Sequence, residues 1–162
     1  MPVNNNVTRL LKSRKISFSA HELPAEKLGA QETARLLNVP VEQVFKTLVV
    51  IRSMGKPILA VIPGSRSLDL KALAEALHEK KVFFPTERQA EQLTGLQAGG
   101  ISPLALINKG FDTIIDESAR KYTEIHVSGG QRGLNIRLPV TSLSDLTRAH
   151  FAPICAVEAS LP

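Results

Sequence analysis

The chain has 162 residues, a net charge of +5 and 43% hydrophobic residues, which suffices for one domain with a buried core. No stretch approaches the roughly 20 apolar residues that span a bilayer, and the N-terminal residues lack the basic and apolar segments of a signal peptide. A single cysteine excludes an internal disulfide and a multi-thiolate metal site. We therefore expect one cytoplasmic domain over residues 1–162, with a charge suited to a polyanionic partner.

The first half of the chain alternates helical and extended patterns. Apolar residues at helical spacing predict an amphipathic helix over residues 7–15, and alternation predicts a half-buried strand over residues 16–20. A second helix is expected over residues 31–38. Two apolar runs, 47–51 and 58–62, are typical of strands, and the Ser-Met-Gly-Lys-Pro segment between them predicts a hairpin.

The second half continues this mixture of helices and short strands. Helices are expected over residues 69–80, 86–95 and 142–150, the second of them opened by a Thr86 capping box and closed by Gly95. Strands are expected over residues 82–84, 113–115, 124–127 and 134–138, and the last dozen residues predict an apolar strand or tail. Adjacent strands interspersed with helices favour an α+β fold with a mixed sheet.

Two loops with paired glycines are the most distinctive features of the sequence. Residues 98–104 read Ala-Gly-Gly-Ile-Ser-Pro-Leu, and residues 127–134 read Val-Ser-Gly-Gly-Gln-Arg-Gly-Leu. Such loops expose backbone N–H groups that bind an oxyanion, a carbonyl or a phosphate, although Gly99 and Gly100 also fit a plain turn. Arg132 fits a phosphate contact and a solvent-exposed position equally well.

Lys46 opens an apolar strand, so its stem is expected to lie on apolar surface while its ammonium reaches a polar opening. From the residue pattern alone, an ordinary lysine that extends to water fits this position best. Asp112, Asp116 and Glu117 are typical of a solvated strand end, although paired carboxylates can also perform general acid–base chemistry. The four histidines lack metal-ligand spacing, and Ser128 lacks an evident catalytic triad.

Four segments in this order and spacing resemble the YbaK family over nearly the whole chain: Phe45-Lys-Thr-Leu, Gly99-Gly-Ile-Ser-Pro, Thr113-Ile-Ile-Asp and Ser128-Gly-Gly-x-Arg-Gly-Leu. The family comprises free-standing aminoacyl-tRNA deacylases related to the editing domain of bacterial prolyl-tRNA synthetase. The resemblance implies a single domain with a twisted, mixed, partly barrel-like sheet surrounded by helices, and no cofactor or metal. It also implies a monomer that deacylates mischarged tRNA(Pro) carrying Cys, Ala or another small amino acid, alone or in a ternary complex with the synthetase.

The resemblance also implies roles for individual residues. Lys46 matches a lysine that is central to activity and is expected to anchor the terminal nucleotide or the ester, while the Gly99 and Gly100 amides receive the oxyanion. Leu23 and Leu28 stand where cysteine-specific members carry Tyr and Phe, so the amino acid removed stays open, as does attack by water or by the substrate's own thiol. The alternative is an inactive module that binds tRNA or the synthetase. The residues expected to bind substrate are Leu23, Leu28, Thr47, Ile101, Ser102, Pro103, Ser128, Gly129, Gly130 and Arg132.

Overall fold

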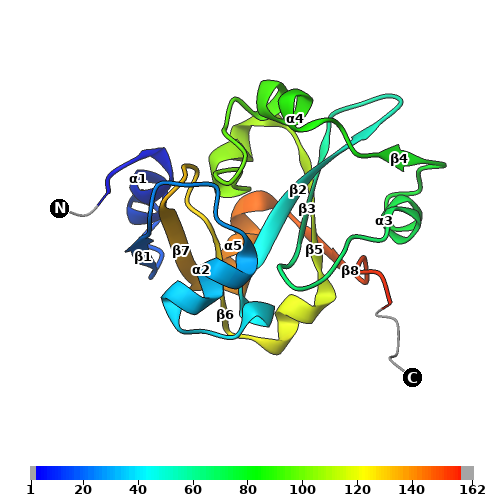
Figure 1. Ribbon diagram of the computed structural model, residues 1–162. Helices are drawn as coiled ribbons and strands as arrows, with labels where there is room; N and C mark the ends of the chain where they lie inside the picture. The colour runs from blue at the N-terminus through cyan, green and yellow to red at the C-terminus, as the bar shows by residue number, and fades with distance from the viewer. Residues whose placement is uncertain (1–2, 158–162) are drawn as a thin grey trace.

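The computed structural model describes residues 3–157 as helices packed around two β-sheets (Figure 1). Within these residues, no helix has the length and apolar character needed to cross a bilayer. The α-helices are α1 (Asn6–Ser13), α2 (Ala30–Leu37), α3 (Leu70–Ala76), α4 (Glu87–Thr94) and α5 (Val140–Thr147). Short 3₁₀ turns are η1 (Val41–Gln43), η2 (Leu104–Lys109) and η3 (Glu117–Lys121).

The strands form one three-stranded and one five-stranded sheet. The smaller sheet is antiparallel, with the order β1-β7-β6, and the larger one, β4-β2-β3-β5-β8, has parallel pairs at β3–β5 and β5–β8. A bridge between Val44 and His126 joins the start of β2 to β6. The predicted α+β fold with a mixed sheet is confirmed, and its two parts meet without closing into a barrel. The strands are β1 (Ser19–Glu22), β2 (Phe45–Arg52), β3 (Ile58–Pro63), β4 (Val82–Phe83), β5 (Asp112–Asp116), β6 (Glu124–Ser128), β7 (Leu134–Pro139) and β8 (His150–Ala152).

The alternation of side chains along β2 decides which residues face the site. Phe45 belongs to the core cluster shared with the three-stranded sheet, α1 and α5, whereas Val50 belongs to a second cluster beneath α3. Because successive strand residues point to opposite faces, Thr47 lies on the side of Phe45. Lys46 lies on the opposite side, with Leu48 and Val50.

Two predicted elements near the N-terminal and central parts of the chain have different boundaries. The predicted strand over residues 16–20 begins only at Ser19, because Lys15 adopts φ 56° and the Ile16 amide still donates to Leu11 O at the end of α1. The predicted helix over residues 69–80 ends at Ala76, because His78 adopts φ 57°. Left-handed backbone at a non-glycine residue interrupts an α-helix.

The remaining elements follow the sequence pattern closely. Thr86 and Gln89 form the predicted capping box, and Gly95 ends α4 with φ 73°. The last helix ends at Thr147 rather than near His150, because Arg148 adopts φ 54° and the chain enters β8. The predicted C-terminal strand or tail lies partly outside the described residues.

Candidate functional site

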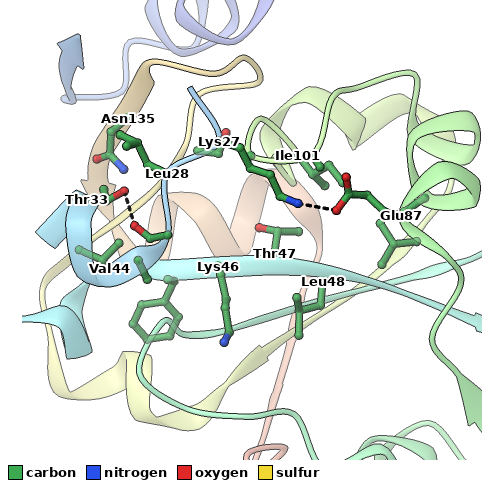
Figure 2. A pocket seen from close by; sticks show the side chains of 18 of the residues that line it. Lys27, Leu28, Thr33, Val44, Lys46, Thr47, Leu48, Glu87, Ile101 and Asn135 are labelled. Atoms are coloured by element: carbon green, nitrogen blue, oxygen red, sulfur yellow. Dashed lines mark hydrogen bonds and ion pairs between the residues drawn. The ribbon is translucent and has the colours of Figure 1, made fainter. Parts of the chain in front are cut away.

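A cavity of about 500 Å³ extends along β2 and brings together segments that are far apart in the sequence. Its walls come from the segment 23–30, the residues before α4 and the two glycine loops (Figure 2). Several predicted site residues lie in this lining, but their contact with substrate stays a prediction. These residues are Leu23, Leu28, Lys46, Thr47, Gly99, Ile101 and Ser128.

The Gly99 turn contributes backbone to the cavity lining. Gly99 has φ +90°, a conformation that strongly favours glycine, and lines the cavity. Among the described residues its N–H has no hydrogen-bond partner, whereas the Gly100 N–H donates to Gln97 O over 2.8 Å. Of the two amides assigned to the oxyanion, only that of Gly99 is therefore available without opening the turn.

Close packing of the two glycine loops explains why glycine is required at position 100 and what the Arg132 side chain contacts. A Cβ on Gly100 would lie 2.9 Å from the backbone of Gln131, so only glycine permits this approach. The Arg132 Nε–H donates to Ala98 O over 2.6 Å and ties the loops together. Arg132 thus makes a structural contact, which differs from both the phosphate contact and the solvent-exposed position considered from the sequence.

Besides Arg132, four of the predicted substrate-binding residues are not part of the cavity lining, within the part of the chain that the structure describes: Ser102, Pro103, Gly129 and Gly130. Ser102 is buried, and its Oγ accepts the Leu104 N–H over 3.1 Å at the start of η2. Asn5 caps α1 and donates from Nδ2 to Gly129 O over 2.9 Å. Direct contact of Ser102, Pro103, Gly129 and Gly130 with substrate remains a prediction, and their observed contacts support the loops.

Lys46 and Thr47 project to opposite faces of β2 (Figure 2). The Lys46 ammonium donates to Gly64 O over 3.4 Å, on the face away from Thr47. The Thr47 hydroxyl is buried and has no hydrogen-bond partner among the described residues, although Thr47 lines the cavity. Because buried polar atoms are normally paired, we expect this hydroxyl to bond a polar group of a ligand that enters the cavity.

Asn135 is a buried polar residue of the cavity that the sequence interpretation missed. It lies opposite Ser128 in the β6–β7 register, and its Oδ1 lies 2.8 Å from His126 Nδ1. Since an amide oxygen only accepts, His126 must donate from Nδ1 and carry its lone pair on Nε2. The hairpin register around the second glycine loop could have placed Asn135 beside Ser128 from the sequence.

Burial lowers the pKa of His126 below its usual value of 6.5, and the nearby charges of His21 and Arg137 lower it further, against opposing contributions from Asn135 and Glu124. Protonation would occur at Nε2, which is buried without a partner among the described residues. The folded state therefore disfavours the imidazolium, while the unfolded chain takes up a proton near pH 6.5.

We expect the free energy of unfolding to decrease as the pH falls below about 6.5 toward the lower pKa of folded His126. Urea titrations at pH 8.0, 6.5 and 5.5 on the wild type and His126→Gln measure this effect. The variant retains an amide donor toward Asn135 but does not titrate, so its stability should change less with pH. An equal pH dependence in both proteins would contradict the assignment.

The outer rim of the cavity includes an exposed ion pair. Lys27 Nζ lies 2.5 Å from Glu87 Oε2, linking the segment before α2 to the start of α4 (Figure 2). The two side chains are 54% and 59% exposed, and such pairs contribute little to stability. The pair can therefore separate at low cost when a ligand enters.

Carboxylate and thiol groups outside the cavity have structural roles. Burial opposes ionisation of Asp116, but hydrogen bonds from Ser118 and from the Ile154 N–H hold its pKa below the usual value. Burial next to Asp116 raises the pKa of the Cys155 thiol to about 12. Asp112 pairs with Arg52. Among residues 3–157, no cluster of His, Cys, Asp or Glu is arranged to hold a metal ion.

Sequence comparison relates the chain to editing proteins. Residues 24–146 match the family described as the aminoacyl-tRNA editing domain. EbsC of Enterococcus faecalis, a candidate Cys-tRNA(Pro)/Cys-tRNA(Cys) deacylase, is 36% identical over 155 residues, or 94% of each chain. A proline–tRNA ligase of Fervidobacterium nodosum is 28% identical over 135 residues, which are 79% of this chain and 23% of the ligase.

Solved structures give the same relationship. A candidate trans-editing enzyme for prolyl tRNA synthetase has a TM-score of 0.80 and 25% identity, covering 96% of this chain and 99% of its own. A hypothetical protein with 23% identity has a TM-score of 0.86 and shares the fold over 94% of this chain and 100% of its own. The chain therefore belongs to the aminoacyl-tRNA editing domain family, in the YbaK-type form that its sequence motifs predict.

Proposed function

We propose that the protein is a trans-editing deacylase that hydrolyses the ester of mischarged tRNA(Pro) carrying cysteine, alanine or another small amino acid. The observation that carries this proposal is the Gly99 turn. Its N–H has no partner among the described residues, and Gly99 lines a cavity of about 500 Å³ together with Lys46 and Thr47. Family membership supplies the chemical class of the substrate.

Ester hydrolysis in this site relies on positioning and on stabilisation of negative charge. An aminoacyl ester is already activated, and a fixed backbone donor stabilises the oxyanion that forms on its carbonyl oxygen. Water attack adds a hydroxyl to the carbonyl carbon, and the ribose oxygen leaves with a proton. With a cysteinyl ester, attack by the substrate thiol instead forms a thiolactone and releases the same tRNA hydroxyl.

Lys46 is assigned to the nucleotide part of the substrate. Its ammonium lies near Gly64 O, on the face of β2 opposite to Thr47, and carries a positive charge suited to a ribose–phosphate group. Apolar residues of the cavity, including Leu28 and Ile101, suit the side chain of a small amino acid.

The proposal also covers the form in which the protein acts. Residues 1–162 act as a single editing domain and a monomer in the cytoplasm, on tRNA alone or on tRNA held by prolyl-tRNA synthetase. Support comes from EbsC, which this chain covers over 94% of its length, and from the proline–tRNA ligases that share the domain.

Single-turnover deacylation tests the function directly. We expect tRNA(Pro) charged with cysteine, alanine or serine to lose at least one of these amino acids about 100-fold faster with the protein than without it. Prolyl-tRNA(Pro) serves as the correctly charged control and should be spared. If none of the mischarged substrates is cleaved while tRNA still binds, the protein is instead an inactive binding module of the same fold.

A further inference from the structure

An exposed phenylalanine stands at the rim of the candidate site. Phe84 follows β4, lines the cavity and is 51% exposed. The chain contains six Phe, one Tyr and no Trp, so few aromatic rings are available to contact a ligand. An exposed aromatic ring at the rim of a cavity is placed to contact a ligand that enters that cavity.

The neighbouring residue Phe83 distinguishes this rim from a general apolar patch. Phe83 is 41% exposed but does not line the cavity, and the Lys81 ammonium lies 5.3 Å from its ring centroid. Phe83 also pairs with Ile51 of β2 through the backbone. Of these two adjacent phenylalanines of similar exposure, only Phe84 lines the cavity.

Charges near Phe84 favour an anionic partner. Lys80 and Lys81 are exposed just before β4 and Arg88 is exposed in α4, and the nearby acids Glu79 and Glu87 are paired with Arg52 and Lys27. An exposed aromatic ring on a segment flanked in sequence by exposed cations suits a nucleobase attached to a phosphate backbone, because every base has a face that can stack.

We propose that Phe84 stacks against the 3′-terminal adenine of the tRNA while the aminoacyl ester occupies the cavity. This inference rests on the proposed function and adds the position of the RNA. Phe83 pairs with Ile51, which lies five residues, or roughly 17 Å of strand, along β2 from Lys46, and the antiparallel direction of β4 brings Phe84 one residue closer to Lys46. Phe84 and Lys46 therefore contact different parts of the substrate end.

Fluorescence of a stacked base tests the proposal without requiring catalysis. The probe is uncharged tRNA(Pro) with 2-aminopurine in place of its 3′-terminal adenine, because stacking quenches this fluorophore. The wild type should quench the probe on binding, and Phe84→Ala should abolish quenching and weaken binding roughly 5- to 150-fold, the range expected for one lost base stack. Phe84→Trp should preserve both signals.

Phe83→Ala is the control, since it removes a ring of comparable exposure, 41% against 51%, one residue away and outside the cavity lining, and should behave as the wild type. The proposal is overturned if Phe84→Ala quenches and binds normally, if Phe83→Ala loses as much as Phe84→Ala, or if the wild type gives no quenching. Deacylation by the wild type is measured separately. Cleavage without Phe84-dependent quenching leaves the proposed function standing and removes the stack, whereas quenching without cleavage does the reverse.

Discussion

Replacing Gly99 with alanine should lower the single-turnover deacylation rate by roughly 100- to 1000-fold, the usual effect of losing one oxyanion donor. At φ +90° an alanine is strained, and its Cβ would lie 3.2 Å from Lys27 Cα and 3.5 Å from Arg132 Cγ. The turn must rotate to relieve these contacts, which displaces the N–H from the ester carbonyl. Rates are measured with the mischarged tRNA that the wild type cleaves fastest.

Gly95→Ala separates loss of the donor from a general loss of stability. Gly95 also has positive φ, +73°, but a Cβ there would meet no atom within 4 Å, and Gly95 lies outside the cavity lining. Both variants should lose about 1–2 kcal/mol of folding free energy, because an L-residue is disfavoured in this region. Only Gly99→Ala should lose the reaction, and equal rates for the two variants would remove the Gly99 amide from the mechanism.

Lys46→Met should weaken the reaction roughly 10- to 150-fold at low enzyme concentration, which corresponds to one lost hydrogen bond to a charged group. Methionine keeps the apolar stem along β2 and removes the ammonium now near Gly64 O. Because Lys46 is assigned to the nucleotide, the loss should appear mainly as a higher enzyme concentration for half-maximal rate. Titrating the enzyme in single-turnover assays separates this binding effect from the rate at saturation.

Lys56→Met controls for the general attraction between a basic protein and tRNA. Lys56 is exposed in the β2–β3 hairpin and lies outside the cavity lining, and its loss changes the net charge by the same amount. The Lys56 variant should stay close to the wild type, while Lys46→Arg should recover part of the lost affinity. If Lys46→Met and Lys56→Met behaved alike, Lys46 would not be an anchor.

Local patterns in the sequence were enough to predict most elements and the principal loops. The hairpin of β2 and β3, the capping box at Thr86 and the α4 end at Gly95 depend on nearest neighbours and backbone preferences, so they can be predicted without tertiary contacts. The helix ends at Ala76 and Thr147 were not predicted, because His78 and Arg148, which follow them, adopt a left-handed backbone that is unusual for non-glycine residues.

The candidate site was predictable only in part, because some of its contacts join residues that are distant in the sequence. Motif order placed Lys46, Gly99 and Ser128 in one family pattern, and the cavity brings them together. Hydrogen bonds and steric fit between distant segments decided the rest. The close approach of Gly100 to the Gln131 backbone and the hydrogen bond from Arg132 Nε to Ala98 O hold the two glycine loops together.

The sequence alone thus determined the family, the α+β class and the loops that build the site, because these follow from local patterns and motif spacing. Only the tertiary structure decided which groups face the cavity. Strand pairing placed Asn135 opposite Ser128, strand alternation sent Lys46 and Thr47 to opposite faces of β2, and the short strand β4 brought Phe84 to the rim. The position of Phe84 depends on pairing between residues that are far apart in the chain, whereas the β6–β7 register and the alternation along β2 are local and needed the packed structure only to show which side faces the cavity.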